Sequence, residues 1–350
     1  MSTESCIVVS VIIPMRNEAR YIARCLRSIV ENDFPQEKLE ILVVDGRSTD
    51  RSCAIVAELA KQFSQIQLLD NPKRIVPSGL NLAIRQSRGE FIIRMDAHSE
   101  YPPNYVTACV RELQRERAEV VGGSLTTLPG AETLTARGIA LLSQHPFGVG
   151  NSGFRLGWQG RYVDTVPFGA FRRSVFERVG LFREELVRHQ DFEMNARIRR
   201  AGGKLFLSPE ISLTYYNLPT VPKLLRRAFL DGLWVARSWM WYPVTFCLRH
   251  CAPLALLLAL VSPLVIAVFV PGLGLLSACF IFLYLACALA SSMQLAVKHG
   301  LALVAVLPLL FLSFHLIYGV GIAAGLLTSL HRSRKDGRTL DEPASVLEPS

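Results

Sequence analysis

The spacing of apolar residues changes repeatedly along the first two hundred positions of the chain. Four continuous apolar runs predict buried strands, at 7–14, 39–45, 66–70 and 90–96. The intervening segments place apolar residues at helical spacing, most clearly in Ile22, Cys25, Leu26, Ile29 and Val30. Strands that alternate with helices of this length predict an α/β fold, with a mainly parallel sheet covered by helices on both faces.

The hydrophobic pattern changes after residue 250. Residues 252–330 contain one Lys, two His and no Asp, Glu or Arg. Three apolar segments, at 252–270, 273–290 and 301–327, predict transmembrane helices, because about 20 apolar residues cross a bilayer. Three crossings would put the basic tail "HRSRKDGR" opposite the basic segment before the spans, so either the third segment re-enters or the tail breaks the positive-inside tendency.

Four regions follow from this pattern. Residues 1–217 form a domain that we expect to face the cytosol, because its start lacks the features of a signal peptide. Residues 218–250 carry basic and Trp side chains and predict an interfacial helix, with an ordinary surface helix as the alternative. Residues 251–330 are the transmembrane region, and 331–350 form a polar, disordered tail.

The net charge of +9 does not indicate nucleic-acid binding, because basic residues are interspersed with acidic ones. A membrane surface and a diphosphate-bearing substrate explain the excess more simply. The eight cysteines show no metal-finger spacing, so we expect reduced, buried thiols.

Polar side chains follow the predicted strands at their carboxyl ends, where open α/β sheets bind ligands. Pro14, Asp45 and Asp96 come from three strands but should meet at one edge. Asp96 and His98 lie two residues apart and would point to the same side of an extended chain. They can hold Mg²⁺ or Mn²⁺ if substrate phosphates complete the shell, or they can be an ordinary polar strand end.

Two further acidic positions could carry chemistry. Asp45 could accept a hydrogen bond from a nucleobase, whereas Ser48 or Asp50 could cap the helix that follows. Asp191, with Glu193 nearby, falls in the first turn of a predicted helix, where the dipole keeps a carboxylate ionised. It could act as a general base, or it could be an acidic N-terminal turn and nothing more.

Five stretches occur in order and together resemble the inverting glycosyltransferases of family 2, which have the GT-A fold. They are "VSVIIPMRNEARYIARCLRSI", "ILVVDGRSTDRS", "GLNLAIRQSRGEFIIRMDAH", "VPFGAFRRSVFERVGLFREEL" and "HQDFEMNARIRRAGGKLFLSP". The resemblance spans residues 8 to about 216 and is greatest for the bacterial exopolysaccharide branch, the succinoglycan type, which also has an apolar C-terminus. It implies a multi-pass enzyme of the bacterial inner membrane.

The resemblance implies roles for individual residues on the donor side. The positions that would bind the nucleotide sugar, expected to be UDP-glucose, are Pro14, Asn17, Glu18, Asp45, Arg74, Asn81 and Asp96. Of these, Asp45 would meet the uracil. Asp96 and His98 stand at the family's Asp-x-Asp position and would hold the divalent cation.

On the acceptor side, Asp191 matches the family's catalytic base, and Gly169, Ala170 and Gln190 would line the acceptor site. The implied acceptor is a lipid-linked saccharide on polyprenyl diphosphate, with a β-1,3 bond formed in exopolysaccharide synthesis. Membrane lipids, and other polysaccharide assembly enzymes, would be further partners.

The chain departs from the family pattern in three places. His98 replaces the second Asp of Asp-x-Asp, and Gln190 replaces the Glu before the base. The Gln-x-x-Arg-Trp motif of processive members is replaced by "RRAFLDGLW", which favours transfer of a single sugar.

Three other functions are alternatives to sugar transfer onto a lipid-linked saccharide. A polyisoprenyl-phosphate sugar transferase shares the soluble fold but uses a lipid phosphate as acceptor. An inactive membrane scaffold or export component is disfavoured by the intact Asp45, Asp96 and Asp191. A dinucleotide-dependent dehydrogenase is excluded because "IIPMRNE" lacks the Gly-rich phosphate turn.

Overall fold

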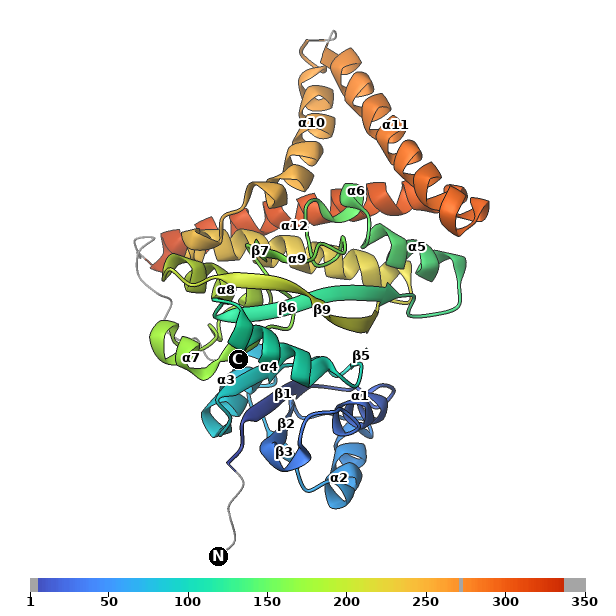
Figure 1. Cartoon of the computed structure of the whole chain (residues 1–350). Coiled ribbons are helices and arrows are strands. Elements are labelled where there is room, and N and C mark those ends of the chain that lie inside the picture. The colour runs from blue at the N-terminus through green and yellow to red at the C-terminus, as the bar shows by residue number, and fades with distance from the viewer. Residues whose placement is uncertain (1–5, 271–272, 337–350) are drawn as a thin grey trace, which may run out of the picture. The chain divides into compact units, whose positions relative to one another are not determined.

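The computed structural model describes residues 6–270 and 273–336, which form two compact units. Unit 1 contains the residues up to Thr126 together with Gly157–Tyr215. Unit 2 contains Thr127–Leu156 and the residues from Tyr216 onward. Figure 1 labels the elements of both units along the chain.

Unit 1 is built on a mixed sheet with the strand order β3-β2-β1-β4-β8-β6-β9-β5, and β7 pairs with β9. The strands are β1 Val9–Met15, β2 Leu39–Asp45, β3 Ile66–Asp70, β4 Phe91–Arg94, β5 Ser99–Glu100, β6 Val120–Leu128, β7 Arg161–Val163, β8 Ala170–Arg172 and β9 Leu205–Tyr216. The strands β3, β2, β1 and β4 are parallel, whereas β8 joins β4 in antiparallel fashion. The carboxyl ends of β1, β2 and β4 therefore lie at one edge of the sheet.

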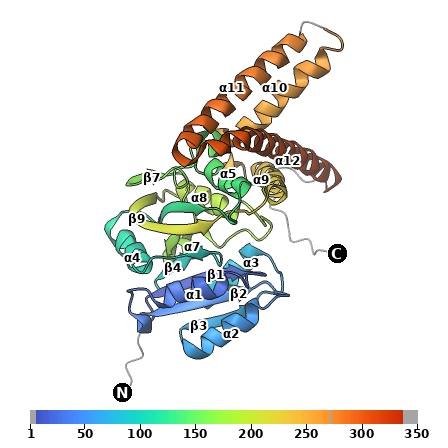
Figure 2. The same ribbon diagram turned by 90° about the vertical axis from the view of Figure 1, so that its right-hand side faces the viewer.

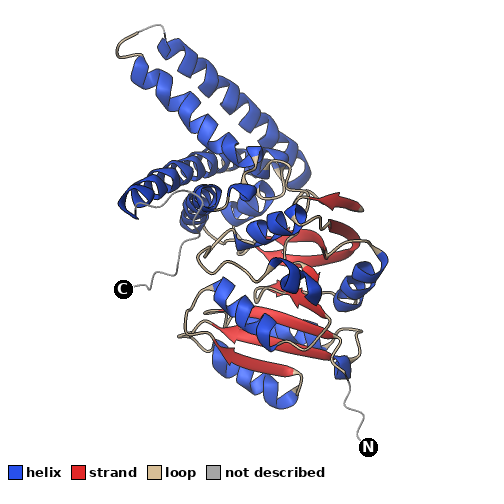
Figure 3. Cartoon of the chain, turned by 90° about the vertical axis from the view of Figure 1, so that its left-hand side faces the viewer, coloured by secondary structure: helices blue, strands red, loops and turns tan. Residues whose placement is uncertain are grey.

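Helices cover the parallel strands on both sides (Figure 3). Those of unit 1 are α1 Ile22–Val30, α2 Ser52–Gln62, α3 Val76–Gln86, α4 Tyr105–Arg115, α7 Arg173–Val179 and α8 Gln190–Arg200, with a short 3₁₀ helix at Gln36–Lys38. The five apolar positions predicted for the first helix are the five residues that α1 buries. The predicted α/β class is confirmed, and its parallel part is the half of the sheet that carries Asp45 and Asp96.

Unit 2 is helical. Its elements are α5 Leu134–Leu142, α6 Pro146–Val149, α9 Val221–Trp241, α10 Ala252–Ile266, α11 Leu273–His299 and α12 Leu307–Asp336, with 3₁₀ turns at Pro243–Thr245, Leu248–Cys251 and Leu301–Ala305. Helices α10 and α11 overlap in the view of Figure 2, whereas Figure 1 shows that they approach each other where α10 ends and α11 begins and diverge from there. Helix α12 continues past residue 331, where we expected the disordered tail to begin, and the rest of that tail, 337–350, lies outside the described residues.

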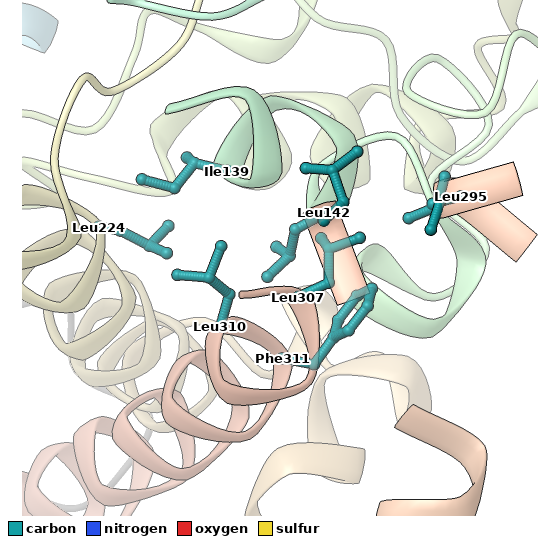
Figure 4. Packing of buried hydrophobic residues seen from close by; sticks show 9 residues of the cluster. Ile139, Leu142, Leu224, Leu295, Leu307, Leu310 and Phe311 are labelled. Atoms are coloured by element: carbon teal, nitrogen blue, oxygen red, sulfur yellow. The ribbon is translucent and has the colours of Figure 1, made fainter. Parts of the chain in front are cut away.

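Residues 127–156, which the sequence pattern assigns to the first domain, pack with the C-terminal helices. The reason is a buried apolar cluster in which Ile139 and Leu142 of α5 meet Leu307, Leu310 and Phe311 of α12 (Figure 4). Each of these side chains is at most 3% exposed. Burial of a Leu or Ile side chain contributes about 1.5–3 kcal/mol, so this cluster holds α5 on the helices of unit 2.

Among the residues that the structure describes, two helices are long and apolar enough to cross a membrane, Gly274–His299 and Leu307–Leu330. The first predicted span, 252–270, gives α10, which has 15 residues. At 1.5 Å per residue α10 is about 22 Å long, shorter than a hydrocarbon core of about 30 Å. All eight cysteines are free; Cys25 and Cys109 are buried as expected, whereas Cys6, Cys279 and Cys287 are exposed.

Candidate active site

The loops after β1 and β2 are joined through Ser48. Its hydroxyl donates to Asp45 Oδ1 over 2.5 Å and accepts from the backbone N–H of Asn17 at 2.8 Å. The Asn17 Oδ1 atom in turn accepts the N–H of Thr49 at 2.8 Å. Asn17 has a left-handed φ of 58°, which lets the chain turn sharply after β1. These bonds fix the carboxylate of Asp45, which is 6% exposed, beside the Asn17 loop.

The loop after β1 also reaches the Asp-x-His pair that follows β4. The Nδ1 atom of His98 lies 3.4 Å from Glu18 Oε1 and 3.6 Å from Asp96 Oδ1. Burial opposes the charged imidazole, but the carboxylates of Asp96 and Glu18 outweigh burial and raise the pKa of His98 to about 10. His98 therefore carries a proton at neutral pH when these carboxylates face it without a cation.

The strand that carries Asp96 also contacts the predicted base. The guanidinium of Arg94, the last residue of β4, forms an ion pair with Oδ1 of Asp191 at the start of α8. Burial opposes the charge of Arg94, but Asp191 and Asp96 outweigh it and raise the pKa of Arg94 further above its ordinary value. Asp96 and Asp191 thus face the same buried cation.

Helix α8 presents one of its two first-turn carboxylates to this site. The side chain of Glu193 is 1% exposed, and both of its oxygens accept from Arg197 at 2.9 Å. The side chain of Asp191 is 34% exposed. Glu193 is therefore held inside the unit, and Asp191 is the one of these two carboxylates that is partly accessible from outside.

The remaining donor-side residues differ in their positions. Pro14 lies within β1, opposite Val44 of β2. Arg74 is exposed. Its Cα atom lies beside the loop after Asp45, 3.5 Å from the position that a Cβ atom on Gly46 would take. Asn81 is 2% exposed, and its amide pairs with both backbone groups of Phe182. We therefore expect the effect of Asn81 on nucleotide binding to be indirect.

On the acceptor side, Gly169 accepts the backbone N–H of Arg94 at 3.1 Å and so lies next to the partner of Asp191. Ala170 is 1% exposed and pairs with Ile93 and Val121 inside the sheet, which leaves its methyl group no access to a sugar. Gln190 is the first residue of α8 and is 7% exposed.

The Asp96–His98 pair fits a divalent cation that is shared with substrate. Two ligands of one Mg²⁺ or Mn²⁺, each about 2.1 Å away, lie roughly 3–4 Å apart, and the two side-chain atoms are 3.6 Å apart. Within the described part of the chain, no three His, Cys, Asp or Glu side chains gather as a metal site. The remaining ligands of a cation here would be phosphate oxygens and water.

Two residues of this site are not evident from the motifs. Arg94 is 6% exposed, its Nε atom has no hydrogen-bond partner, and its guanidinium lies 5.3 Å from the ring centroid of Phe168. Phe168 adopts a left-handed φ of 44°, which is rare for a bulky residue. The signal in the sequence was a charged residue inside the apolar run "FIIRM", since a buried charge requires a partner.

Known glycosyltransferases are similar to this chain. The family model "Glycosyl transferase family 2" matches residues 10–180. A dolichyl N-acetyl-α-D-glucosaminyl phosphate 3-β-D-2,3-diacetamido-2,3-dideoxy-β-D-glucuronosyltransferase of Methanococcus voltae is 29% identical over 91% of this chain and 97% of its own length. The succinoglycan biosynthesis protein ExoA of Rhizobium meliloti is 28% identical over 73% of this chain and 76% of its own.

A solved structure shows the same fold. The mannosyltransferase PcManGT from Pyrobaculum calidifontis, in complex with GDP-Man and Mn²⁺, aligns with a TM-score of 0.58 and 22% identity, over 91% of this chain and 86% of that one. At this identity the likeness concerns the fold, which is GT-A. Residues 10–180 therefore match the family 2 glycosyltransferases, and the fold that they help to form is GT-A; Asp45, Asp96 and Asp191 are linked at one edge of its sheet.

Proposed function

We propose that this glycosyltransferase moves one sugar from a nucleotide-sugar donor onto a lipid-linked saccharide at a membrane, with inversion at the anomeric carbon. One observation carries the proposal. A continuous series of contacts joins Asp45 to the Asn17–Glu18 loop, that loop to His98 and Asp96, and the Asp96 strand to Asp191. Donor, diphosphate and acceptor can therefore meet at one sheet edge.

Asp191 is the general base in this proposal. Its carboxylate takes the proton of an acceptor hydroxyl while that oxygen attacks the anomeric carbon from the face opposite the leaving diphosphate. The attack forms the new glycosidic bond, breaks the bond to the diphosphate and inverts the configuration. Arg94 fixes the position of the carboxylate from inside the unit, and the exposed part of Asp191 faces the acceptor.

The donor is held from the other end of the same edge. Asp45 accepts a hydrogen bond from the nucleobase, while Asn17 and Glu18 border the ribose. Asp96 and His98 would hold Mg²⁺ or Mn²⁺, which would supply positive charge against the leaving diphosphate. For His98 to act as a ligand it must release the proton that Asp96 and Glu18 favour.

The acceptor class follows from the apolar helices and from two relatives. The Methanococcus voltae protein is named for transfer to a dolichyl-phosphate sugar, and ExoA is named for succinoglycan biosynthesis. These support a lipid-linked saccharide as acceptor. The narrower proposal is UDP-glucose as donor and a β-1,3 bond in exopolysaccharide synthesis, at the inner membrane of a bacterium with unit 1 in the cytosol.

A polyisoprenyl phosphate is the alternative acceptor. It differs from a lipid-linked saccharide because the attacking oxygen belongs to a phosphate, which is already ionised at neutral pH and needs no base. The exposed carboxylate of Asp191 next to the site favours a hydroxyl acceptor, since its negative charge would repel an incoming phosphate.

The test is a donor and acceptor screen on membranes that contain the full-length chain, with Mg²⁺ or Mn²⁺ present. Labelled nucleotide sugars are offered with polyprenyl diphosphate saccharides or with polyprenyl phosphate. We expect label in the lipid-linked saccharide, in the anomeric configuration opposite to that of the donor. Label on polyprenyl phosphate would support the alternative, and a product with retained configuration would contradict the mechanism.

A further inference from the structure

Helices α9 and α12 approach each other backbone to backbone. A Cβ built on Gly321 would lie 2.2 Å from the carbonyl oxygen of Phe229, and one on Gly232 would lie 2.2 Å from the carbonyl oxygen of Tyr318. One turn further on in both helices, a Cβ built on Gly325 would lie 2.5 Å from the carbonyl oxygen of Leu233. The contact of Phe229 with Gly321 is thus followed by that of Leu233 with Gly325, so α9 and α12 run in the same direction, packed on each other (Figure 1).

Helix α9 carries charges along its whole length. Lys223 and Arg226 are exposed near its start, Arg227 pairs with Asp231 at 3.4 Å, and Arg237 lies 5.0 Å from the ring centroid of Trp234. Each Arg, Lys or Asp at the centre of a bilayer opposes insertion by about 2.5–3.5 kcal/mol or more. A helix with these side chains belongs at the membrane surface, where Trp is favoured and basic groups meet anionic lipid headgroups.

The start of α12 is also attached to a charged element. Leu307, Leu310 and Phe311 pack against α5 in the cluster shown in Figure 4. On α5 the guanidinium of Arg137 donates to the carbonyl oxygen of His299, at the end of α11, over 2.9 Å. Both halves of α12 are thus packed on elements that carry charges, although α12 is long and apolar enough to span a bilayer.

The hairpin of α10 and α11, unlike the charged helix α9, is apolar over most of its length. Residues 252–297 contain no charged side chain and no histidine. Large apolar side chains point outward from the hairpin: Phe269 is 82% exposed, Phe282 76% and Leu275 72%. These side chains form an apolar surface that requires hydrocarbon around it.

We propose that the layer formed by α9 and α12 lies in the membrane interface against anionic lipid headgroups, and that only the α10–α11 hairpin enters the hydrocarbon. Because a hairpin enters and returns, the end of α12 stays on the side where α9 begins. The basic tail "HRSRKDGR" then lies on the same side as the basic face of α9 and follows the positive-inside tendency. This inference rests on the membrane association in the proposed function.

The first experiment locates both ends of the full-length chain, with epitope tags at the N-terminus and the C-terminus. In inside-out vesicles an added protease should remove both tags, and in intact cells it should remove neither. Tags on opposite sides would show that α12 crosses, and would overturn this inference alone. Release of the chain by an alkaline carbonate wash would contradict its membrane association and overturn the inference together with that part of the proposed function.

The second experiment measures depth directly, with spin labels at Val320→Cys and Leu283→Cys in a background without the native cysteines. Val320, 40% exposed, is near the middle of α12, and Leu283, 60% exposed, is near the middle of α11. We expect the label at 320 to collide mainly with a water-soluble relaxant and the label at 283 mainly with oxygen. Equal depth at the two positions would overturn the interfacial placement of α12.

Discussion

Arg94 is the charged residue of a strand whose other members, Phe91, Ile92 and Ile93, are apolar and buried. A buried guanidinium is stable in a protein only when it meets opposite charge, and Asp191 and Asp96 supply it. Arg94 therefore connects the strand that leads to Asp96 with the helix that carries Asp191. In the proposed mechanism Arg94 is a positioning residue that acts through Asp191.

Replacing Arg94 by Met should lower kcat by roughly 10²-fold, because a base displaced by about 1 Å loses about this much of its effect. The KM for the donor should stay within about threefold of the wild-type value. The kcat of Arg94→Lys should lie between those of the wild type and Arg94→Met, because Lys keeps the charge but lacks the planar fork of Arg. Steady-state kinetics check this. Arg178→Met, which removes an exposed pair with Glu119, is the matched control. A folded Arg94→Met enzyme with unchanged kcat would refute the positioning role.

The protonation of His98 should make the affinity for a divalent cation depend on pH. Its pKa is raised to about 10 by neighbouring carboxylates, so a cation bound by its imidazole must displace a proton at neutral pH. The affinity for Mg²⁺ in the presence of donor nucleotide should rise with pH, by up to about tenfold per unit between pH 6.5 and 8.5. Calorimetric titrations at several pH values measure it, and His98→Gln should remove the dependence. An affinity of the wild type that does not change with pH would argue against His98 as a ligand.

The positive charge of His98 also contributes to the free energy of unfolding. The pKa of His98 in the folded chain lies above its ordinary value, so the stabilisation from its carboxylate partners is complete below about pH 6.5 and is lost as the pH rises toward 10.

Residues that belong to a sequence motif could be predicted as candidates for the site. Residues whose position depends on a partner far along the chain could not. Asp45, Asp96, His98 and Asp191 were predicted because their spacing matches a family pattern, and contacts link them at one edge of the sheet, while their roles stay predictions. Asn81 was predicted to hold the nucleotide sugar, but its amide is occupied by Phe182, a partner about a hundred residues away. Arg94 was missed for the same reason.

At the scale of elements, the close approach of α9 and α12 depends on glycines in both helices. A methyl group at Gly321 would overlap the carbonyl oxygen of Phe229, which belongs to the backbone of α9 and cannot rotate away. The two helices would have to separate, and the contacts of Gly232 and Gly325 would weaken with them.

Gly321→Ala should destabilise unit 2 by about 1–3 kcal/mol, the usual range for an overpacked site. Thermal unfolding of the full chain in detergent, followed by circular dichroism, measures the effect. Gly274→Ala in α11 is the control, because its Cβ would lie 3.7 Å from its nearest neighbour, Ala267, and should not lower the unfolding temperature. Equal unfolding temperatures for the two variants would contradict the close packing of α9 on α12.

Most strands and helices of unit 1 follow from periodicity, since their apolar faces are the faces they bury. Ends were less predictable. Ser48 was a candidate N-cap of the second helix, but α2 begins at Ser52, and the Ser48 hydroxyl bridges Asp45 and Asn17 instead. The apolar run 252–270 extends beyond α10, which ends at Ile266. Apolar composition alone does not specify where a helix stops.

In the molecule as a whole, each of the two compact units is built from two separate segments of the chain. Residues 127–156 are the end of β6 and most of the segment that leads to β7, yet they belong to the helical unit. Their apolar residues predict that they are buried but not against which partner, because Ile139 contacts residues more than 150 positions later. The family pattern could therefore predict the GT-A fold and the residues proposed for its site, but not this arrangement.

The central claim is that three acids from distant parts of the chain serve one sugar-transfer site, in which Asp191 is the base. Asp191→Asn tests it most directly, because Asn has the same shape but cannot take a proton from the acceptor. Sugar transfer and nucleotide binding should be measured on the same purified variant. The account predicts that transfer falls by roughly 10²–10⁴-fold while nucleotide affinity changes little. Transfer at the wild-type rate by Asp191→Asn would contradict it.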